Sequence, residues 1–448
     1  MPPRLFTFLD RFGMLLVLAL LCGYYAVATL AEQTPRGTDA AEAVARQVAE
    51  TAPKGATIWI GARTNAEQQQ FADALRTLLQ TDGYSIAGRT LGEPSDLRDA
   101  LDRAAAQNLA LDALVVSADF ERVANNVIAR TPAYQNVPVL APASYRWPTF
   151  LLPNNLRNVA NQIVVIAIIA IGMTLVIITA GIDLSVGSLI ALSAVVAAYM
   201  IRGWGGVDAG LGALLGASLL AIALCGLIGF FSGITITRFN VPPFIATLAM
   251  MLVASGLAYI IAEGESIYEI PDSFVWLGRG ADLLSIPNAV VLMVVLYLIA
   301  HLVMTRTTLG RYIYAVGGNM EAARLSGIRV DAVLLFVYTL SGIVAGLGGI
   351  IQASQLKSGA PTYGLLYELY VIAAVVVGGT SLAGGEGRIS GTLIGALIIG
   401  VIQNGMNLTG VESYAQKVVL GFVILGAVLL DMLKKSPRWQ RLGQRAAS

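Results

Sequence analysis

Long apolar runs without charged residues follow one another along the chain from residue 159 onwards, and one more lies near the N-terminus. Most of these runs are close to the roughly 20 residues that an α-helix needs to cross a bilayer. The pattern predicts a polytopic α-helical membrane protein with about ten spans. The expected spans are residues 12–31, 159–180, 184–201, 209–231, 243–262, 286–305, 332–353, 369–383, 389–408 and 415–431.

A different pattern fills residues 32–153, between the first two spans. Short apolar runs alternate there with amphipathic runs of helical period, which indicates βαβ units on a parallel sheet. We therefore expect a small α/β domain. Its expected strands are 56–61, 84–90, 111–117 and 137–142, and its expected helices are 65–83, 95–107 with Ser95 as N-cap, and 120–130. No G-x-G-x-x-G follows the first strand, so a dinucleotide site is not supported.

The composition agrees with a membrane protein. Of the 448 residues, 56% are hydrophobic and only 13% are charged, whereas soluble domains are about one quarter charged. The net charge of +1 gives the chain no general attraction for nucleic acid. Cys22 and Cys225 both lie in apolar runs, and His301 is the single histidine. A disulfide framework or a zinc site is therefore not supported.

The basic residues orient the spans. If the N-terminus is cytoplasmic and the sides alternate, the cytoplasmic segments hold 13 Lys and Arg residues and the short segments opposite hold 5. The positive-inside rule then predicts that both termini are cytoplasmic and that residues 32–153 are exported. Residues 1–31 are expected to be a membrane anchor, with a cleaved signal peptide as the alternative. Residues 436–448 are expected to be a basic cytoplasmic tail.

Asp183 is the one charged residue of the stretch TAGIDLSVGS, between two expected spans. A single helix over 159–201 would be about 65 Å long, against a hydrocarbon core of about 30 Å. The chain must therefore fold back here. Gly181 suits the position just after a helix end, and Asp183 or Ser185 suits the N-cap of the next helix.

Two interpretations of this fold-back remain open. A capped helical hairpin alone would explain the residue types. Alternatively, irregular backbone at membrane depth marks a polar cavity, with Asp183, Ser185 and Ser188 along a substrate path. Asn404 and Asn407, three residues apart in the ninth span, could line such a path or only bond neighbouring helices. Glu368, at the start of the eighth span, is expected to be an interfacial cap.

The segment 305–330 is the longest and most basic internal loop. Within it, NMEAARLSGI predicts a short helix that Asn319 caps and Gly327 ends. Ala322, Ala323 and Leu325 would offer a small apolar surface. Such a helix could dock into a groove on a partner protein or lie on lipid headgroups.

Three motifs in fixed order resemble those of ribose-type ABC importer permeases. GIDLSVGSLIAL resembles the signature of that family, and residues 305–330 resemble its cytoplasmic loop. VVVGGTSLAGGEGRISGTLIGALIIG (375–400) resembles its late glycine-rich signature. The resemblance covers about residues 156–435, which implies a permease domain over 154–435, and the exported insert is a departure from the family.

The resemblance implies a transport subunit, not an enzyme, that moves a pentose, hexose or similar polar metabolite across the bacterial inner membrane. The candidate residues for the substrate path remain those that the polar positions suggest, namely Asp183, Ser185, Ser188, Asn404 and Asn407. The resemblance also implies contact with an ABC ATPase subunit through the residues Glu321, Ala322, Arg324, Leu325 and Gly327. The other implied partners are a second permease copy or paralogue, an extracytoplasmic substrate-binding protein and the lipid bilayer. The chain has no G-x-x-x-x-G-K-[ST], so ATP hydrolysis is expected on a separate chain and no cofactor on this one.

Other functions also fit the pattern. The solute could be a nucleoside, a branched-chain amino acid or a signalling sugar. From a different class, the chain could be a membrane-anchored sensor that binds ligand through residues 32–153. An intramembrane enzyme is disfavoured because no catalytic set is evident. The insert weakly resembles part of one lobe of a sugar-type binding protein, and it could be a receptor lobe, a docking platform or a spacer.

Overall fold

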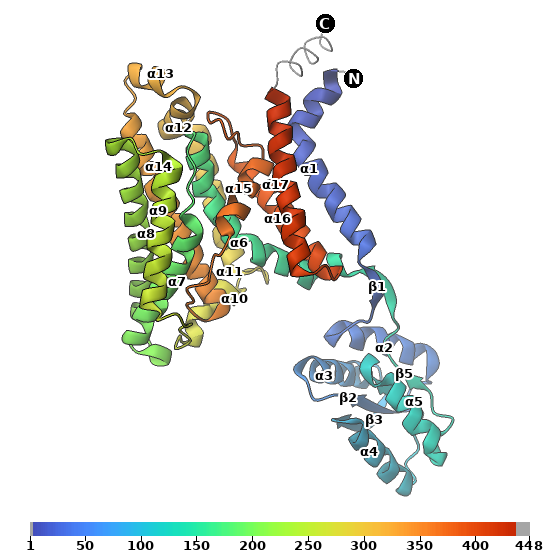
Figure 1. The fold of residues 1–448 in the computed structure, drawn as a ribbon. Coiled ribbons are helices and arrows are strands. Elements are labelled where there is room, and N and C mark those ends of the chain that lie inside the picture. The colour runs from blue at the N-terminus through green and yellow to red at the C-terminus, as the bar shows by residue number, and fades with distance from the viewer. Residues whose placement is uncertain (1–2, 436–448) are drawn as a thin grey trace. The chain divides into compact units, whose positions relative to one another are not determined.

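The computed structural model describes residues 3–435 and divides into two compact units (Figure 1). The membrane unit joins the N-terminal helix, up to Thr29, to the chain from Phe150 onwards. The second unit is Leu30–Thr149, referred to below as the α/β domain. The expected tail at 436–448 lies outside the described residues.

Seven helices of the described chain are long and apolar enough to cross a membrane. They are α6 (Pro153–Ile178), α7 (Val186–Gly203), α8 (Leu211–Phe239), α9 (Pro243–Ile261), α11 (Asn288–Arg306), α14 (Val330–Leu356) and α16 (Ile389–Leu408). Shorter apolar stretches lie in α1 (Pro3–Ala28), α15 (Tyr367–Val377) and α17 (Ser413–Lys435). The prediction of a polytopic helical protein with an α/β region is confirmed. Among the described residues, seven of the ten expected spans are therefore long and apolar enough to cross a membrane.

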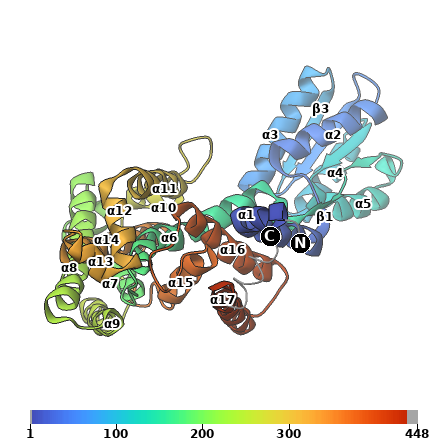
Figure 2. The same ribbon diagram turned by 90° about the horizontal axis from the view of Figure 1, so that it is seen from above.

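Burial separates the central helices of the membrane unit from the peripheral ones. The most apolar window of α6 is 89% buried, whereas those of α8 and α9 are 28% and 22% buried. A helix that is apolar on all sides belongs either in the centre of a bundle or against lipid. Viewed from above, α14 lies among α6, α7 and α8, while α15, α16 and α17 lie on the other side of α6 (Figure 2).

Glycines permit α8 and α14 to pack closely. Each helix carries a G-x-x-x-G pair, Gly229 with Gly233 and Gly342 with Gly346. A Cβ added at Gly229 would overlap the backbone carbonyl of Tyr338, and one added at Gly342 would meet the backbone of α8. Small residues at such a crossing bring two backbones into contact, which stabilises helix pairs in lipid.

The shorter helices of the membrane unit lie in its connections. They are η3 (Thr149–Leu151), which straddles the domain boundary, and η4 (Gly206–Asp208), η5 (Asp272–Val275), α10 (Trp276–Arg279), α12 (Thr308–Gly318) and α13 (Met320–Leu325). The span expected at 369–383 is wrong at its end, because α15 stops at Val377. Gly379, at φ +89°, turns the chain into a loop there.

The α/β domain contains the expected parallel sheet. Its strands are β2 (Thr57–Ala62), β3 (Ser85–Leu91), β4 (Ala113–Val116) and β5 (Val139–Leu140), in the order β3-β2-β4-β5. All three strand pairs are parallel, which confirms the prediction of βαβ units. Apolar residues of α2 (Gly37–Thr51) and α3 (Ala66–Thr81) cover one face, and those of α4 (Pro94–Ala106) and α5 (Glu121–Arg130) cover the other. The 3-10 turns η1 (Ala118–Phe120) and η2 (Pro132–Tyr134) complete the domain.

Two features of this domain differ from expectation. Ser95 is not an N-cap, because α4 begins at Pro94 and the Asp96 carboxylate accepts from the Glu93 N–H at 2.8 Å. The helix α2 has no counterpart among the expected elements. In addition, β1 (Leu30–Gln33) and β6 (Tyr145–Pro148) form an antiparallel two-stranded ribbon from the two ends of the domain.

The α8–α14 contact predicts different effects for two glycine substitutions. Gly229→Ala should lower the thermal unfolding midpoint of the purified protein, because forced overpacking costs about 1–3 kcal/mol. Gly256→Ala, at an exposed site within α9 with nothing near the added Cβ, should leave the midpoint unchanged or raise it. Equal midpoints for the two variants would contradict the close contact.

Candidate substrate pathway and coupling surface

The chain reverses direction directly after α6. Ala180 is in the left-handed conformation at φ +60°, and the N–H groups of Ala180 and Gly181 bond back to the last turn of α6 at 2.9 and 3.0 Å. This is the bonding pattern of a helix end with its left-handed residue at Ala180. The expectation that Gly181 takes that position is therefore wrong. Gly181 instead lies against Tyr338, because a Cβ there would overlap the hydroxyl of that side chain.

Asp183 is fully enclosed and accepts three hydrogen bonds. Its side chain accepts from the N–H of Ser185 at 3.0 Å and from the Ser185 hydroxyl at 2.6 Å. A third bond comes from the hydroxyl of Ser341 on α14, at 2.7 Å. Asp183 and Ser185 are each 1% exposed. Donors thus satisfy the carboxylate, as buried acidic groups require.

The expected N-cap bond is absent. Ser185 stands at the N-cap position of α7, but its side chain accepts no capping hydrogen bond. Its hydroxyl donates to Asp183 instead. The bond from the Ser185 N–H to the aspartate two residues earlier has the pattern of an Asx-turn, which holds the backbone in a reversal. Asp183 therefore stabilises the turn itself and not the first turn of α7.

Asp183 lies deep along the bundle. Ser341 is the eleventh residue after Val330, the first of α14, which corresponds to about 16 Å at 1.5 Å per residue. A Cβ on Gly172, within α6, would lie 2.9 Å from the Ser341 Cα, so the same level is reached inside α6. The segment after α6 therefore turns back into the bundle. Ser341 is thus close to the middle of α14, which has 27 residues.

A second broken element meets the first. The helix α15 begins at Tyr367, and Glu368 in its first turn lies against Gly187 in the first turn of α7. A Cβ on Gly187 would overlap the Glu368 carboxylate and lie 2.6 Å from the carbonyl oxygen of Gly364. Glu368 thus lies beside the start of α7. Ser188 and Glu368 are both half-buried.

The three motif segments converge beside this break. The N–H of Gly385, in the glycine-rich loop, donates to the Ile178 carbonyl at the end of α6 at 2.8 Å. Gly317, near the end of α12, packs so closely on the same carbonyl that a Cβ would overlap it. The Tyr314 hydroxyl of α12 donates to the Gly387 carbonyl at 2.8 Å. Segments far apart in sequence therefore form one contact network.

The helix α13 forms with the expected cap. The Asn319 side chain accepts from the Ala322 N–H at 2.9 Å, and Gly327 follows the helix at φ +82°. Leu325 is 88% exposed, and Glu321, Ala322, Arg324 and Gly327 are exposed as well. Ala323 was expected on the same surface but is buried. The helix lies with α12 at one end of the bundle (Figure 1). Arg324 also pairs with Asp331 of α14 at 3.2 Å.

The structure does not bring the two asparagines to Asp183. Asn404 and Asn155 exchange side-chain hydrogen bonds at 2.9 and 3.0 Å. Asn155 is near the start of α6, about 35 Å along that helix from Ile178 at 1.5 Å per residue. Asn407 is exposed and accepts from Gln416 at 2.8 Å.

Sequence reasoning missed two residues of the site, Ser341 and Tyr338, and it did not place a third, Glu368, beside α7. Glu368 carried the same signal as Asp183, a carboxylate beside apolar residues, but its place against α7 depends on tertiary folding. Ser341 and Tyr338 gave no signal, because single polar residues are common in apolar spans. The hydroxyl of Tyr338 has no hydrogen-bond partner among the described residues.

The Asp183–Ser341 bond predicts a specific stability effect. Ser341→Ala should lower the thermal unfolding midpoint, because a buried carboxylate that loses a donor costs about 1–3 kcal/mol. Ser218→Ala is the matched control, since its hydroxyl bonds only the Leu214 carbonyl of its own helix. If both variants unfold at the same temperature, the Ser341 hydroxyl has no special role.

The membrane unit has known relatives. A sequence model described as branched-chain amino acid transport system / permease component matches residues 155–428. Over 292 residues the chain is 48% identical to the ribose import permease protein RbsC of Escherichia coli K12, covering 64% of this chain and 88% of that protein. It is 39% identical over 284 residues to the D-allose transport system permease protein AlsC of the same strain (63% and 85%). It is 35% identical over 302 residues to the L-arabinose ABC transporter permease protein AraH of Azospirillum brasilense (67% and 86%).

No solved structure matches the chain. The matched residues contain all three motifs, and they begin after the α/β domain. The membrane unit is therefore the part that carries the transport role, and the α/β domain is an addition to it. The chain belongs to this family of permease components, as a ribose-type ABC importer permease with an additional N-terminal α/β domain.

Proposed function

We propose that this chain forms the membrane path of an ATP-driven importer for a pentose or hexose sugar in a bacterial inner membrane. The solute class rests on the names of the relatives, which are permeases for ribose, allose and arabinose. The observation that carries the mechanism is the contact network between the break after α6, the end of α12 and the glycine-rich loop.

The proposed path passes the facing starts of α7 and α15. A neutral sugar needs both donors and acceptors, and Ser188 and Glu368 offer both where the two helix starts meet. Asp183 and Ser185 are enclosed here, so they would reach the solute only after the break rearranges. The unpartnered hydroxyl of Tyr338 lies beside the same break. We assign Asn404 and Asn407 to helix packing instead.

The proposed coupling runs from α13 to that break. An ATPase subunit that seats on Leu325, Glu321 and their exposed neighbours would displace α13, and α12 would move with it. Because Gly317 of α12 packs directly on the Ile178 carbonyl, the displacement would reach the end of α6. The turn that carries Asp183 lies five residues further along the chain.

The proposed orientation of the chain in the membrane follows from this coupling. The first residues of α1 lie at the same end of the membrane unit as α13 (Figure 1), which supports a cytoplasmic N-terminus, ten spans and an exported α/β domain. A second permease copy or paralogue would complete the path. A separate ATPase would hydrolyse ATP, and an extracytoplasmic binding protein would deliver the solute.

Reconstitution tests the proposed function. The chain would be placed in liposomes with its ATPase and binding-protein partners, and ATP-dependent uptake of labelled D-ribose, D-allose and L-arabinose would be measured. Leucine and adenosine serve as comparison solutes. Uptake of either of these alone would overturn the solute class. Ligand binding without uptake in the complete complex would favour a sensor.

The coupling surface predicts that a charge on α13 impairs transport, whereas the same charge in the α10–α11 connection does not. Leu325→Asp should abolish ATP-driven uptake and solute-stimulated ATP hydrolysis, because it places a charge on the apolar contact of α13. Leu284→Asp is the control, since Leu284 is 85% exposed against 88% for Leu325 but lies in the α10–α11 connection. Wild-type coupling in Leu325→Asp would contradict the proposed docking.

The path predicts a role for Glu368 in uptake. Glu368→Gln should raise the KM for sugar by about tenfold, because a hydrogen bond to a charged group is worth about 1.5–3 kcal/mol. Glu412→Gln, in the exposed α16–α17 connection, should leave the KM unchanged. An unaltered KM in a stable Glu368→Gln protein would remove this residue from the path.

A further inference from the structure

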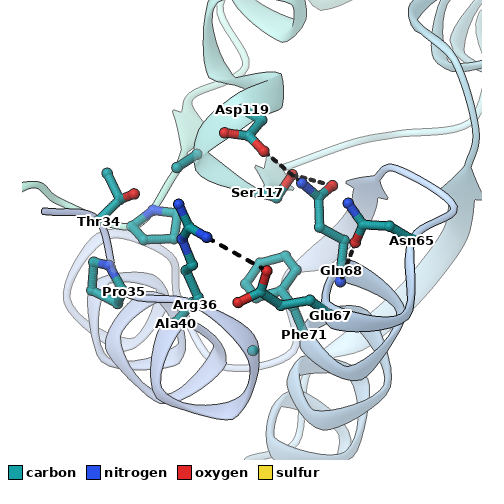
Figure 3. Close-up of a pocket in the computed structure, with 13 residues that line it drawn as sticks. Thr34, Pro35, Arg36, Ala40, Asn65, Glu67, Gln68, Phe71, Ser117 and Asp119 are labelled. Carbon is teal, nitrogen blue, oxygen red and sulfur yellow. Dashed lines mark hydrogen bonds and ion pairs between the residues drawn. The ribbon is translucent and has the colours of Figure 1, made fainter. Parts of the chain in front are cut away.

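The α/β domain contains a pocket at the carboxyl ends of its strands. The pocket has a volume of about 180 Å³, and Figure 3 shows the residues around it. They come from the segments that follow β1, β2 and β4, together with Pro142 after β5. The family match begins beyond this domain, so the relatives assign no role to it.

The pocket lies where the strand order reverses. The chain passes from β2 to β3 at one side, then crosses to β4 and β5 at the other. The helix α3 after β2 packs on one face of the sheet, whereas α5 after β4 packs on the opposite face. The loops after β2 and β4 therefore diverge and leave a crevice. In open α/β sheets, ligands bind at this kind of switch point.

A hydrogen-bond network fixes the polar wall of the crevice. Gln68 is 8% exposed, and its side-chain oxygen accepts from the Arg63 N–H at 2.6 Å and from the Ser117 hydroxyl at 3.1 Å. Its amide donates to the Asp119 carboxylate at 2.8 Å. The Asn65 oxygen accepts from the Gln68 N–H at 2.8 Å. One side chain thus joins the loops after β2 and β4, which holds the wall in place.

The lining favours a small neutral ligand with several hydroxyl groups. Glu67 and Asp119 provide carboxylate acceptors, while Arg36 and the Asn65 amide provide donors. Two carboxylates against one guanidinium leave a net negative charge, which disfavours anions such as phosphate. Phe71 adds an apolar surface that suits the C–H face of a sugar ring. The volume is below the roughly 300–1,000 Å³ of pockets for drug-sized ligands, so the ligand must be small.

We propose that the α/β domain binds a neutral polyhydroxylated solute of monosaccharide size in this pocket. The site is separate from the path through the membrane unit. Binding here does not require transport, so the failure of one proposal leaves the other standing. The domain would add a solute-binding site to a permease whose relatives are matched only over their membrane region.

Calorimetry and hydrogen exchange on the full-length protein in nanodiscs test the site. D-ribose and D-glucose are the neutral probes, and ribose 5-phosphate and inorganic phosphate are the anionic ones. A neutral probe should bind and slow amide exchange in residues 63–68 and 117–119. The proposal is overturned if neither sugar protects these segments. It is also overturned if the anionic probes bind more tightly than the sugars.

Two variants and a control locate the binding. Asp119→Asn should weaken sugar binding about tenfold, because it removes a charged acceptor, and Ala118→Trp should abolish binding by filling the pocket. Asp99→Asn changes an exposed carboxylate on α4 and should bind as the wild type does. If one pocket variant fails to fold, the other variant still tests whether the sugar binds in this pocket. Wild-type affinity and protection in either folded pocket variant would place the sugar elsewhere.

Discussion

The structure of the membrane unit depends on one requirement, that a carboxylate deep in an apolar bundle must be surrounded by donors. Asp183 meets it with Ser185 from its own turn and Ser341 from α14. These bonds fix the reversal after α6, the start of α7 and the middle of α14 at one level. Irregular backbone is tolerated at membrane depth only where protein encloses it, and the 1% exposure of Asp183 shows that it does.

Glycine at tight contacts makes that enclosure possible. The absence of a side chain leaves room for the Tyr338 hydroxyl at Gly181, for Glu368 at Gly187 and for the end of α6 at Gly317. Each of these positions lies in a motif or beside one, so the motifs are regions of close backbone contact as much as sets of polar side chains. A bundle packed in this way shifts between discrete arrangements more readily than it deforms, which is what alternating access requires.

The sequence predicted the membrane unit well because apolar length and charge spacing are local properties. It located the reversal at Asp183 and the cap at Asn319 for the same reason. It missed Ser341, Tyr338 and the place of Glu368, since their roles arise from contacts between segments far apart in the chain. It put Gly181 at the end of α6, because a glycine needed for packing looks the same in sequence as one needed for conformation.

The ribbon of β1 and β6 brings the two ends of the α/β domain together. The α/β domain leaves and re-enters the membrane unit at adjacent residues, because the Phe150 N–H bonds the Thr29 hydroxyl at 3.1 Å. Leu30 pairs with Pro148 directly beyond that junction. A domain whose two ends meet behaves as a removable cassette. Exchange of the α/β domain for another domain with neighbouring termini would therefore leave the two flanking helices in place.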